Sequence, residues 1–196
     1  MRESLGVSAR SNENYADTCG NSGAQKILPD INFATPWQRI TVAEAFARYS
    51  PVSLRQALET GSFDEILTEY VEPQLGFESP AFLCDYPEQL APLARKSPSD
   101  QSTAERFELY IQGVELANGF SELTDQHEQR SRFQKEIAVI HSTTGRSVAM
   151  PERFLEDIGR MGAAAGIALG ADRLFMLAKD YKNIAGAVTF APSDFV

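Results

Sequence analysis

The sequence has few of the residues from which metal centres and nucleic-acid surfaces are usually built. Two cysteines and two histidines occur in 196 residues, and their positions do not follow a zinc-binding spacing. The 18 Lys and Arg are outnumbered by 27 Asp and Glu, which gives a net charge of −9. Because phosphate contacts need clustered basic residues, we do not expect a broad surface for tRNA or other nucleic acids.

Long apolar runs are also missing from the sequence. No stretch approaches the length of a membrane-spanning helix, and no apolar signal core is visible at the N-terminus, so the cytoplasm is the expected compartment. A hydrophobic content of 43% is enough to bury one substantial core. Residues 1–36 are rich in Ser, Asn and Gly, and we expect a poorly ordered leader there, followed by one domain over 37–196.

Helical and strand patterns alternate along this domain. Thr41 can cap a first helix, and a second helical pattern covers residues 63–71. Residues 81–86 have the composition of a short strand, and Asp125 is expected to cap a further helix. The side chains that this last helix is expected to bury are Phe133, Ile137 and Ile140. Helices interspersed with antiparallel strands predict the α+β class, an antiparallel sheet flanked by helices.

An acidic β-hairpin carries the strongest chemical signal. Strand patterns over 107–111 and 114–118 flank a two-residue turn at 112–113. This turn places Glu108 and Glu115 on one face of the hairpin as diagonal neighbours. Two carboxylates on one face favour a cation between them, and Mg²⁺ that is bound to nucleotide phosphates takes such ligands. The alternative is a strand face that is simply solvated.

The hairpin continues into three further polar or aromatic positions. Its register is expected to pair Tyr110 with Glu115, and Glu108 with Ala117. The continuation offers an amide, an aromatic ring and an acid, which are Asn118, Phe120 and Glu122. Strict alternation would place these three opposite Glu115. A β-bulge near Asn118-Gly119 would turn them onto the same face, and a glycine inside a strand often marks a bulge.

Two blocks of sequence carry a resemblance to a known family. The first, 106–125, reads Arg-Phe-Glu-Leu-Tyr-Ile-Gln-Gly-Val-Glu-Leu-Ala-Asn-Gly-Phe-Ser-Glu-Leu-Thr-Asp. The second, 165–174, reads Ala-Gly-Ile-Ala-Leu-Gly-Ala-Asp-Arg-Leu. They resemble the active-site hairpin and motif 3 of the lysyl-tRNA-synthetase-like class II synthetases. The resemblance extends from about residue 37 to the C-terminus, and it implies ATP and Mg²⁺ as cofactors.

The resemblance implies roles for nine residues. It implies ATP binding by Glu115, Leu116, Gly170 and Arg173, with Glu115 and Arg173 also catalytic. It implies Mg²⁺ binding by Glu108 and Glu115. It implies contacts with a lysine-like amino acid by Asn118, Phe120, Glu122 and Ala168, with Glu122 pairing with the side-chain ammonium. These roles agree with elementary chemistry, since a carboxylate selects an amine, and Arg173 in the first turn of a helix favours phosphate.

Finer features resemble one branch of the family, the elongation factor P–(R)-β-lysine ligases. Ala168 and Thr124 stand where the tRNA-charging relatives typically have Gly and Asn. The resemblance implies that (R)-β-lysine is adenylated and passed to a lysine of elongation factor P, with tRNA not expected as a partner. A lysyl-tRNA synthetase fragment and an inactive lysine-binding regulator are the alternatives.

Two signature segments of the family are not recognisable in the sequence. Motif 1, which supports the family's dimer, and motif 2, whose Arg grips the α-phosphate, would precede the hairpin, and residues 1–36 hold no Phe-Arg-x-Glu segment. The chain therefore resembles the C-terminal part of a catalytic domain. The homodimer of the intact family is doubtful for this segment, and we expect it to be inactive alone.

Overall fold

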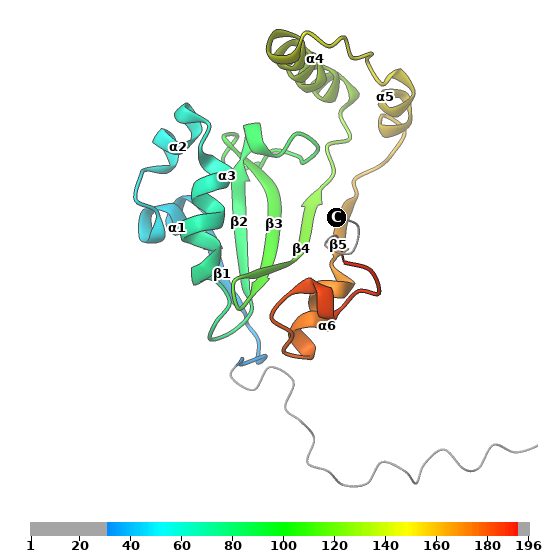
Figure 1. The fold of residues 1–196 in the computed structure, drawn as a ribbon. Coiled ribbons are helices and arrows are strands. Elements are labelled where there is room, and N and C mark those ends of the chain that lie inside the picture. The colour runs from blue at the N-terminus through cyan, green and yellow to red at the C-terminus, as the bar shows by residue number, and fades with distance from the viewer. Residues whose placement is uncertain (1–30, 192–196) are drawn as a thin grey trace, which may run out of the picture.

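The computed structural model describes residues 31–191, which build one five-stranded sheet with helices around it (Figure 1). The strands lie in the order of the chain, and only the first pair is parallel. They are β1 (Gln38–Thr41), β2 (Ala81–Pro87), β3 (Thr103–Ile111), β4 (Val114–Ser121) and β5 (Ala165–Leu169). The predicted α+β class is confirmed, and the parallel pair makes the sheet a mixed one.

The N-terminal helices cover one face of the first three strands. They are α1 (Val42–Tyr49), α2 (Leu54–Thr60), α3 (Phe63–Ile66), the π-helix η1 (Leu67–Val71) and the 3₁₀ helices η2 (Glu72–Gln74) and η3 (Glu88–Leu90). Thr41 caps α1 as predicted, because its side chain accepts from the Glu44 N–H at 3.1 Å while Glu44 Oε2 accepts from the Thr41 N–H at 2.9 Å. The single helix predicted over 63–71 is instead α3 followed by a π-turn, and α2 was not predicted.

The main core lies between these helices and the sheet. The buried side chains that it contains are Ile40, Val42, Ala45, Phe46, Ala57, Phe63, Leu67, Val71, Leu75, Ala81, Leu83, Tyr86 and Tyr110. A smaller cluster joins Ile31, Ile111, Leu116 and Leu177. Ile31 therefore packs against the domain ahead of Trp37, where we expected order to begin. Residues 1–30 of the predicted leader lie outside the described residues.

The hairpin between β3 and β4 turns at Gln112 and Gly113, as predicted. Both residues have positive φ, 51° and 74°, which suits a two-residue hairpin turn. Tyr110 pairs with Glu115, also as predicted.

The register beyond this pair differs from the prediction, because Glu108 pairs with Asn118 and not with Ala117. Leu109 pairs with Ala117 and Tyr110 with Glu115, so that Leu116 is the extra residue of a β-bulge. The bulge predicted near Asn118-Gly119 therefore lies two to three residues earlier. Its effect is the predicted one, since Asn118 and Phe120 now share a face with the glutamates.

The C-terminal half extends from the end of β4 and returns to it. It holds α4 (Gln126–Thr144), α5 (Glu152–Ile158), α6 (Ala171–Ala178) and the 3₁₀ helix η4 (Ile184–Gly186). Asp125 caps α4 as predicted, accepting from the N–H groups of residues 127 and 128 at 2.8 and 3.1 Å. The residues that α4 buries are Gln129 and Arg132, whereas the three apolar residues predicted to be buried are only partly covered.

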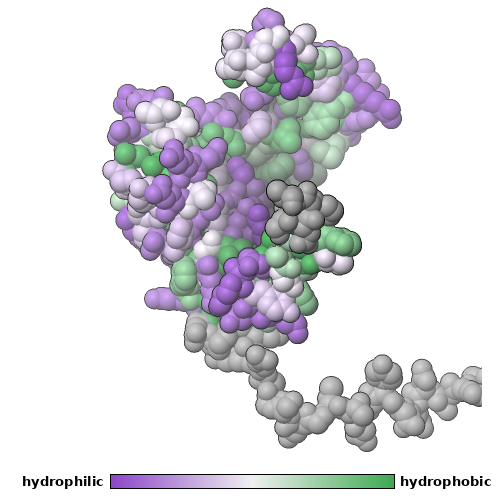
Figure 2. Space-filling model, viewed as in Figure 1, coloured by the Kyte–Doolittle hydropathy of each residue, from purple (hydrophilic) through white to green (hydrophobic). Residues whose placement is uncertain are grey.

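The edge strand β5 is open to solvent at all five of its residues. Figure 2 shows hydrophobic surface around α5 and the segment that leads to β5, where Phe154 and Met161 are exposed. Ile167 of β5 is exposed as well. Within residues 31–191, no helix combines the length and the hydropathy that crossing a membrane requires.

Candidate functional site

The bulge in β4 and the start of α6 bring together the residues predicted to bind ATP. The Gly170 N–H donates to the Leu116 carbonyl at 2.8 Å, which fixes the N-terminus of α6 against the bulge. Arg173, in the first turn of α6, donates from Nη1 to the Glu115 carbonyl at 2.8 Å and to Glu115 Oε2 at 3.1 Å. The Leu116 side chain is buried in the smaller cluster. Leu116 therefore contributes to the site through its carbonyl, which anchors Gly170.

Glu108, which was predicted to bind Mg²⁺, is held by four hydrogen-bond donors. Its side chain is 8% exposed. The hydroxyls of Tyr86 and Tyr110 donate to its Oε2 at 2.5 and 2.6 Å. Arg106 Nη2 and Asn118 Nδ2 donate to its Oε1 at 2.5 and 3.0 Å. Each carboxylate oxygen thus accepts two hydrogen bonds, which is its full capacity.

The groups around Glu108 are themselves fixed. Burial above all, and then the charge of Glu108, raises the pKa of the Tyr86 hydroxyl, so this phenol stays protonated as a donor. The Arg106 guanidinium lies 4.3 Å from the centre of the Tyr86 ring, and its Nη1 donates to the Leu90 carbonyl at 3.1 Å. Arg106 Nε also donates to Asn118 Oδ1 at 3.3 Å. One network therefore joins the predicted metal acid to Asn118, a predicted amino-acid contact.

The residues predicted to contact the amino acid line one cavity of about 490 Å³. Strand register explains the arrangement, because Asn118 lies opposite Ala168, and Phe120 lies opposite Gly166. The cavity wall also includes Arg106 and the loop 90–94. The four predicted residues that share this cavity are Asn118, Phe120, Glu122 and Ala168.

Glu122 is the acidic residue that lines this cavity, and no side chain or backbone group of residues 31–191 donates a hydrogen bond to its carboxylate. Its backbone is fixed by a hydrogen bond from its N–H to the Ala164 carbonyl at 2.9 Å and by a bridge to Ala94. Gly166 makes room for it, since a Cβ at that position would lie 3.1 Å from Glu122 Oε1. Glu122 can therefore accept hydrogen bonds from a ligand cation, which Glu108 cannot do without losing a donor.

Two buried polar residues of α4 hold the opposite wall of the cavity. Gln129 Nε2 donates to the Pro92 carbonyl at 3.1 Å. Arg132 Nη1 donates to the carbonyls of Ala91 and Ala94 at 2.9 and 3.0 Å. Ala91 and Ala94 are buried, and a buried carbonyl without a partner is costly, so these donors stabilise the loop that lines the cavity.

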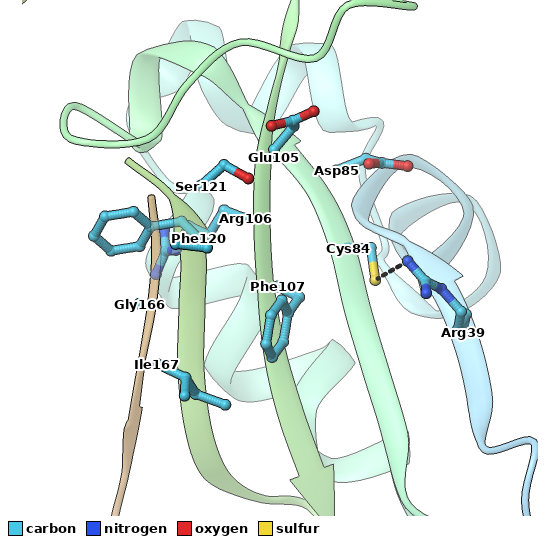
Figure 3. A pocket seen from close by; sticks show the side chains of 11 residues that line it. Arg39, Cys84, Asp85, Glu105, Arg106, Phe107, Phe120, Ser121, Gly166 and Ile167 are labelled. Atoms are coloured by element: carbon cyan, nitrogen blue, oxygen red, sulfur yellow. Dashed lines mark hydrogen bonds between the residues drawn. The ribbon is translucent and has the colours of Figure 1, made fainter. Parts of the chain in front are cut away.

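A second cavity, of about 500 Å³, opens on the other face of the sheet (Figure 3). Phe107 and Ile167 project into it from β3 and β5, while Arg39 reaches across to Cys84 with its Nη2 3.9 Å from Sγ. Arg106 and Phe120 line both cavities. None of the nine predicted site residues other than Phe120 borders it.

The hairpin acids suit Mg²⁺ in the presence of nucleotide phosphates. Within residues 31–191 no group of three or more His, Cys, Asp or Glu side chains is arranged to hold a metal by itself. Mg²⁺ bound with a nucleotide needs one or two carboxylates beside the phosphate oxygens. Glu108 and Glu115 are oxygen ligands of the required type on one face. Glu115 is the more open of the two, with its side chain 31% exposed, whereas Glu108 could bind an ion only by losing one of its four donors.

Comparison with known proteins places the chain in a family. The sequence profile of the tRNA synthetases class II (D, K and N) matches residues 8–194. The chain belongs to this class II synthetase family. The predicted family is thereby confirmed, and the match begins at residue 8, inside the predicted leader 1–36.

Relatives of this class II chain are named as ligases. It is 44% identical over 127 residues to an elongation factor P–(R)-β-lysine ligase of Haemophilus influenzae, covering 64% of this chain and 39% of that protein. It is 35% identical over 182 residues to a lysine–tRNA ligase of Campylobacter jejuni, covering 82% of this chain and 36% of that protein. The chain thus spans less than two fifths of the length of either relative.

Four further residues of the site were not predicted as functional. Arg106 and Tyr110 lie two positions on either side of Glu108, so strand alternation places them on its face and could have found them. Tyr86 and Glu72 come from β2 and η2. No local pattern marks these two, because they meet the hairpin only through the folding of the chain.

Proposed function

We propose that the chain is the C-terminal part of the catalytic domain of an ATP-dependent ligase. This ligase adenylates a lysine-like amino acid, (R)-β-lysine, and transfers it to a lysine of elongation factor P. The observation that carries the proposal is the Glu122 carboxylate, which lines a cavity and has no hydrogen-bond donor among residues 31–191. Glu122 follows directly after β4, the strand that holds Glu115, and Glu115 pairs with Arg173 of α6. An amine-binding acid beside a phosphate-binding cation is what the activation of a diamino acid requires. We infer that the reaction takes place in the cytoplasm.

The chain's own residues divide the work of binding and positioning. Mg²⁺–ATP supplies the adenylyl group: a carboxylate oxygen of the amino acid displaces pyrophosphate from the α-phosphorus, and the acceptor amine later displaces AMP from the acyl carbon. Arg173 faces the phosphates and Glu115 orients it. Glu122 binds the side-chain ammonium while Asn118 and Phe120 line the stem. No side-chain nucleophile is needed, because catalysis rests on positioning and charge stabilisation.

Ala168 supports the choice of the β-lysine branch. Its methyl group lies opposite Asn118 on the cavity wall. A methyl group at a wall changes which isomer fits by about 1–3 kcal/mol. The stronger identity to the β-lysine ligase of Haemophilus influenzae points the same way.

A second candidate function is that of a lysine–tRNA ligase segment. The relative from Campylobacter jejuni favours it, because that alignment covers 82% of the chain. The net charge of −9 favours the protein acceptor over tRNA. An inactive lysine-binding regulator, the third candidate, would bind the amino acid without binding Mg²⁺–ATP.

Calorimetric titration of the chain tests the proposal through binding, which does not require turnover. We expect (R)-β-lysine to bind more tightly than L-lysine, and (R)-3-aminohexanoic acid, which lacks the terminal amine, to bind at least about 10-fold more weakly than (R)-β-lysine. Equal binding of the compounds with and without the terminal amine would refute the proposal. Binding of tRNA but not of elongation factor P by the same chain would favour the second candidate.

A further inference from the structure

The loop that forms one wall of the amino-acid cavity is held at each of its backbone carbonyls. Residues 91–94 border the cavity and belong to none of the helices or strands described above. Three of their four carbonyls accept from side chains of α4, those of Gln129 and Arg132, at 2.9 to 3.1 Å. The fourth, that of Leu93, accepts from the Leu123 N–H at 2.9 Å. Surface loops are usually mobile, so this complete pairing marks a rigid wall.

The same loop adjoins the acid proposed to bind the amine. Ala94 forms an isolated antiparallel bridge with Glu122. Next to this bridge, the Arg95 N–H donates to the Ser121 carbonyl at 2.8 Å. The hydrogen bonds that hold the loop therefore also fix the distance between the wall and Glu122, where the amine end of a ligand would lie.

Gln129 is an unfavourable residue for a position that needs only to be filled. Its side chain is completely buried, and its Oε1 accepts no hydrogen bond from residues 31–191. Methionine would fill a similar volume without burying an acceptor that lacks a partner. What glutamine adds is the Nε2 group, which donates to the Pro92 carbonyl. Because buried polar atoms without partners are rare and are often found at functional sites, we look for the role of Gln129 in the loop.

Arg132 holds the loop from the next turn of α4. Gln129 and Arg132 are three residues apart, so they lie on one face of the helix. The Arg132 side chain is 8% exposed, and its Nη2 donates to Glu128 Oε1 at 2.6 Å while Nη1 holds the carbonyls of Ala91 and Ala94. The planar guanidinium keeps these acceptors in a fixed arrangement, which a lysine ammonium on its flexible stem would not do.

We infer that Gln129 and Arg132 are positioning residues that fix the length of the amino-acid cavity at its amine end, and that they thereby select a diamino acid of one chain length. The inference rests on the proposed function, because a lysine-like ligand on Glu122 defines that end. Neither side chain lines the cavity, so both act through the backbone of residues 91–94. A rigid wall is needed for such selection, since a loop that can shift would make room for one more methylene.

Calorimetric titration with two diamino acids tests the inference. They are (R)-β-lysine and its homologue with one more methylene, 3,7-diaminoheptanoic acid of the same spatial configuration. The unmodified chain should bind the longer compound at least about 10-fold more weakly. Gln129→Met should reduce this ratio of Kd values about 3- to 10-fold, which is the range of one net hydrogen bond. Its free energy of unfolding in urea should stay the same or rise, because the substitution also removes the buried oxygen without a partner.

Two further variants complete the test. Arg132→Lys keeps the charge but not the fixed arrangement of donors, so it should also reduce the ratio. Gln134→Met makes the same replacement as Gln129→Met at an exposed position of α4, and it should leave the ratio unchanged. Should Arg132→Lys fail to fold, Gln129→Met decides alone.

The possible failures can be told apart. If the unmodified chain binds (R)-β-lysine but Gln129→Met keeps the full ratio, the inference is wrong and the proposed function stands. The same holds if Gln129→Met only lowers the free energy of unfolding, because Gln129 then merely attaches α4 to the domain. Equal binding of both homologues by the unmodified chain would show that the wall selects nothing. If the unmodified chain binds neither compound, the proposed function fails together with the inference.

Discussion

Replacing Glu122 by Gln probes amine recognition with almost no change of shape. The carboxylate lines the cavity and has no donor from residues 31–191, so the substitution breaks no hydrogen bond of the described structure. The lost interaction is a charge-assisted hydrogen bond to a ligand ammonium in a partly enclosed cavity. Such a bond is worth about 1.5–3 kcal/mol, which corresponds to roughly 10- to 150-fold in affinity. The Kd for (R)-β-lysine should rise by that factor.

Calorimetry with (R)-β-lysine and with (R)-3-aminohexanoic acid separates this effect from general damage. Glu122→Gln should weaken the diamino compound and leave the compound without a terminal amine unchanged. Glu105→Gln is a matched control, because Glu105 borders the other cavity and pairs with Arg95 at 2.8 Å on the surface. The Glu105→Gln variant should bind (R)-β-lysine with the same Kd as the unmodified chain. Unchanged binding of (R)-β-lysine by Glu122→Gln would show that the amine is recognised elsewhere.

Three other predictions follow from single features of the chain. Ala168→Gly removes one methyl from the cavity wall, so the difference in binding free energy between L-lysine and (R)-β-lysine should shift in favour of L-lysine by about 1–3 kcal/mol. An unchanged ratio of the two Kd values would contradict the choice of branch. The 196-residue chain alone should show little or no ATP–pyrophosphate exchange, because no motif 2 supplies an α-phosphate clamp, and robust exchange would contradict that interpretation. Gly76→Ala should lower the free energy of unfolding by about 2–4 kcal/mol in urea denaturation, since Gly76 has a φ of 78° and a Cβ there would lie 2.5 Å from the Tyr110 carbonyl oxygen. Gly61→Ala, with a similar φ but open space around it, should cost only about 1 kcal/mol.

Local features were the ones that could be predicted from the sequence. The caps at Thr41 and Asp125 depend on residues two or three positions away, and the turn at 112–113 depends on two adjacent residues that tolerate positive φ. The π-turn in the second helical pattern was not predicted. Its apolar spacing is that of an ordinary helix, and the extra residue is accommodated by packing against the sheet.

The position of the bulge shows where local reasoning ends. A glycine in the strand suggested Gly119, yet the extra residue is Leu116. Leu116 leaves the ladder because its side chain packs with Ile111 and Leu177, and because its carbonyl accepts from Gly170. Gly119 is instead required by a close approach, since a Cβ there would lie 2.7 Å from the Phe107 ring.

The sequence by itself determined the α+β class and the hairpin with its two acids, because strand alternation and turn residues are local. The four residues that line one cavity, Asn118, Phe120, Glu122 and Ala168, came from the resemblance to the family. Only the tertiary structure decided which acid is free. Glu122 and Glu108 look alike in the sequence. In the structure, however, Glu108 accepts hydrogen bonds from Tyr86 on the neighbouring strand β2 and from Tyr110. The Tyr110 hydroxyl is also within hydrogen-bond distance of Glu72, which comes from a helical turn far away in the sequence. Both acids have the same number of lone pairs, but folding decides which of them are already used, because it brings donors to Glu108 from β2 and β4. No pattern along the chain records those contacts.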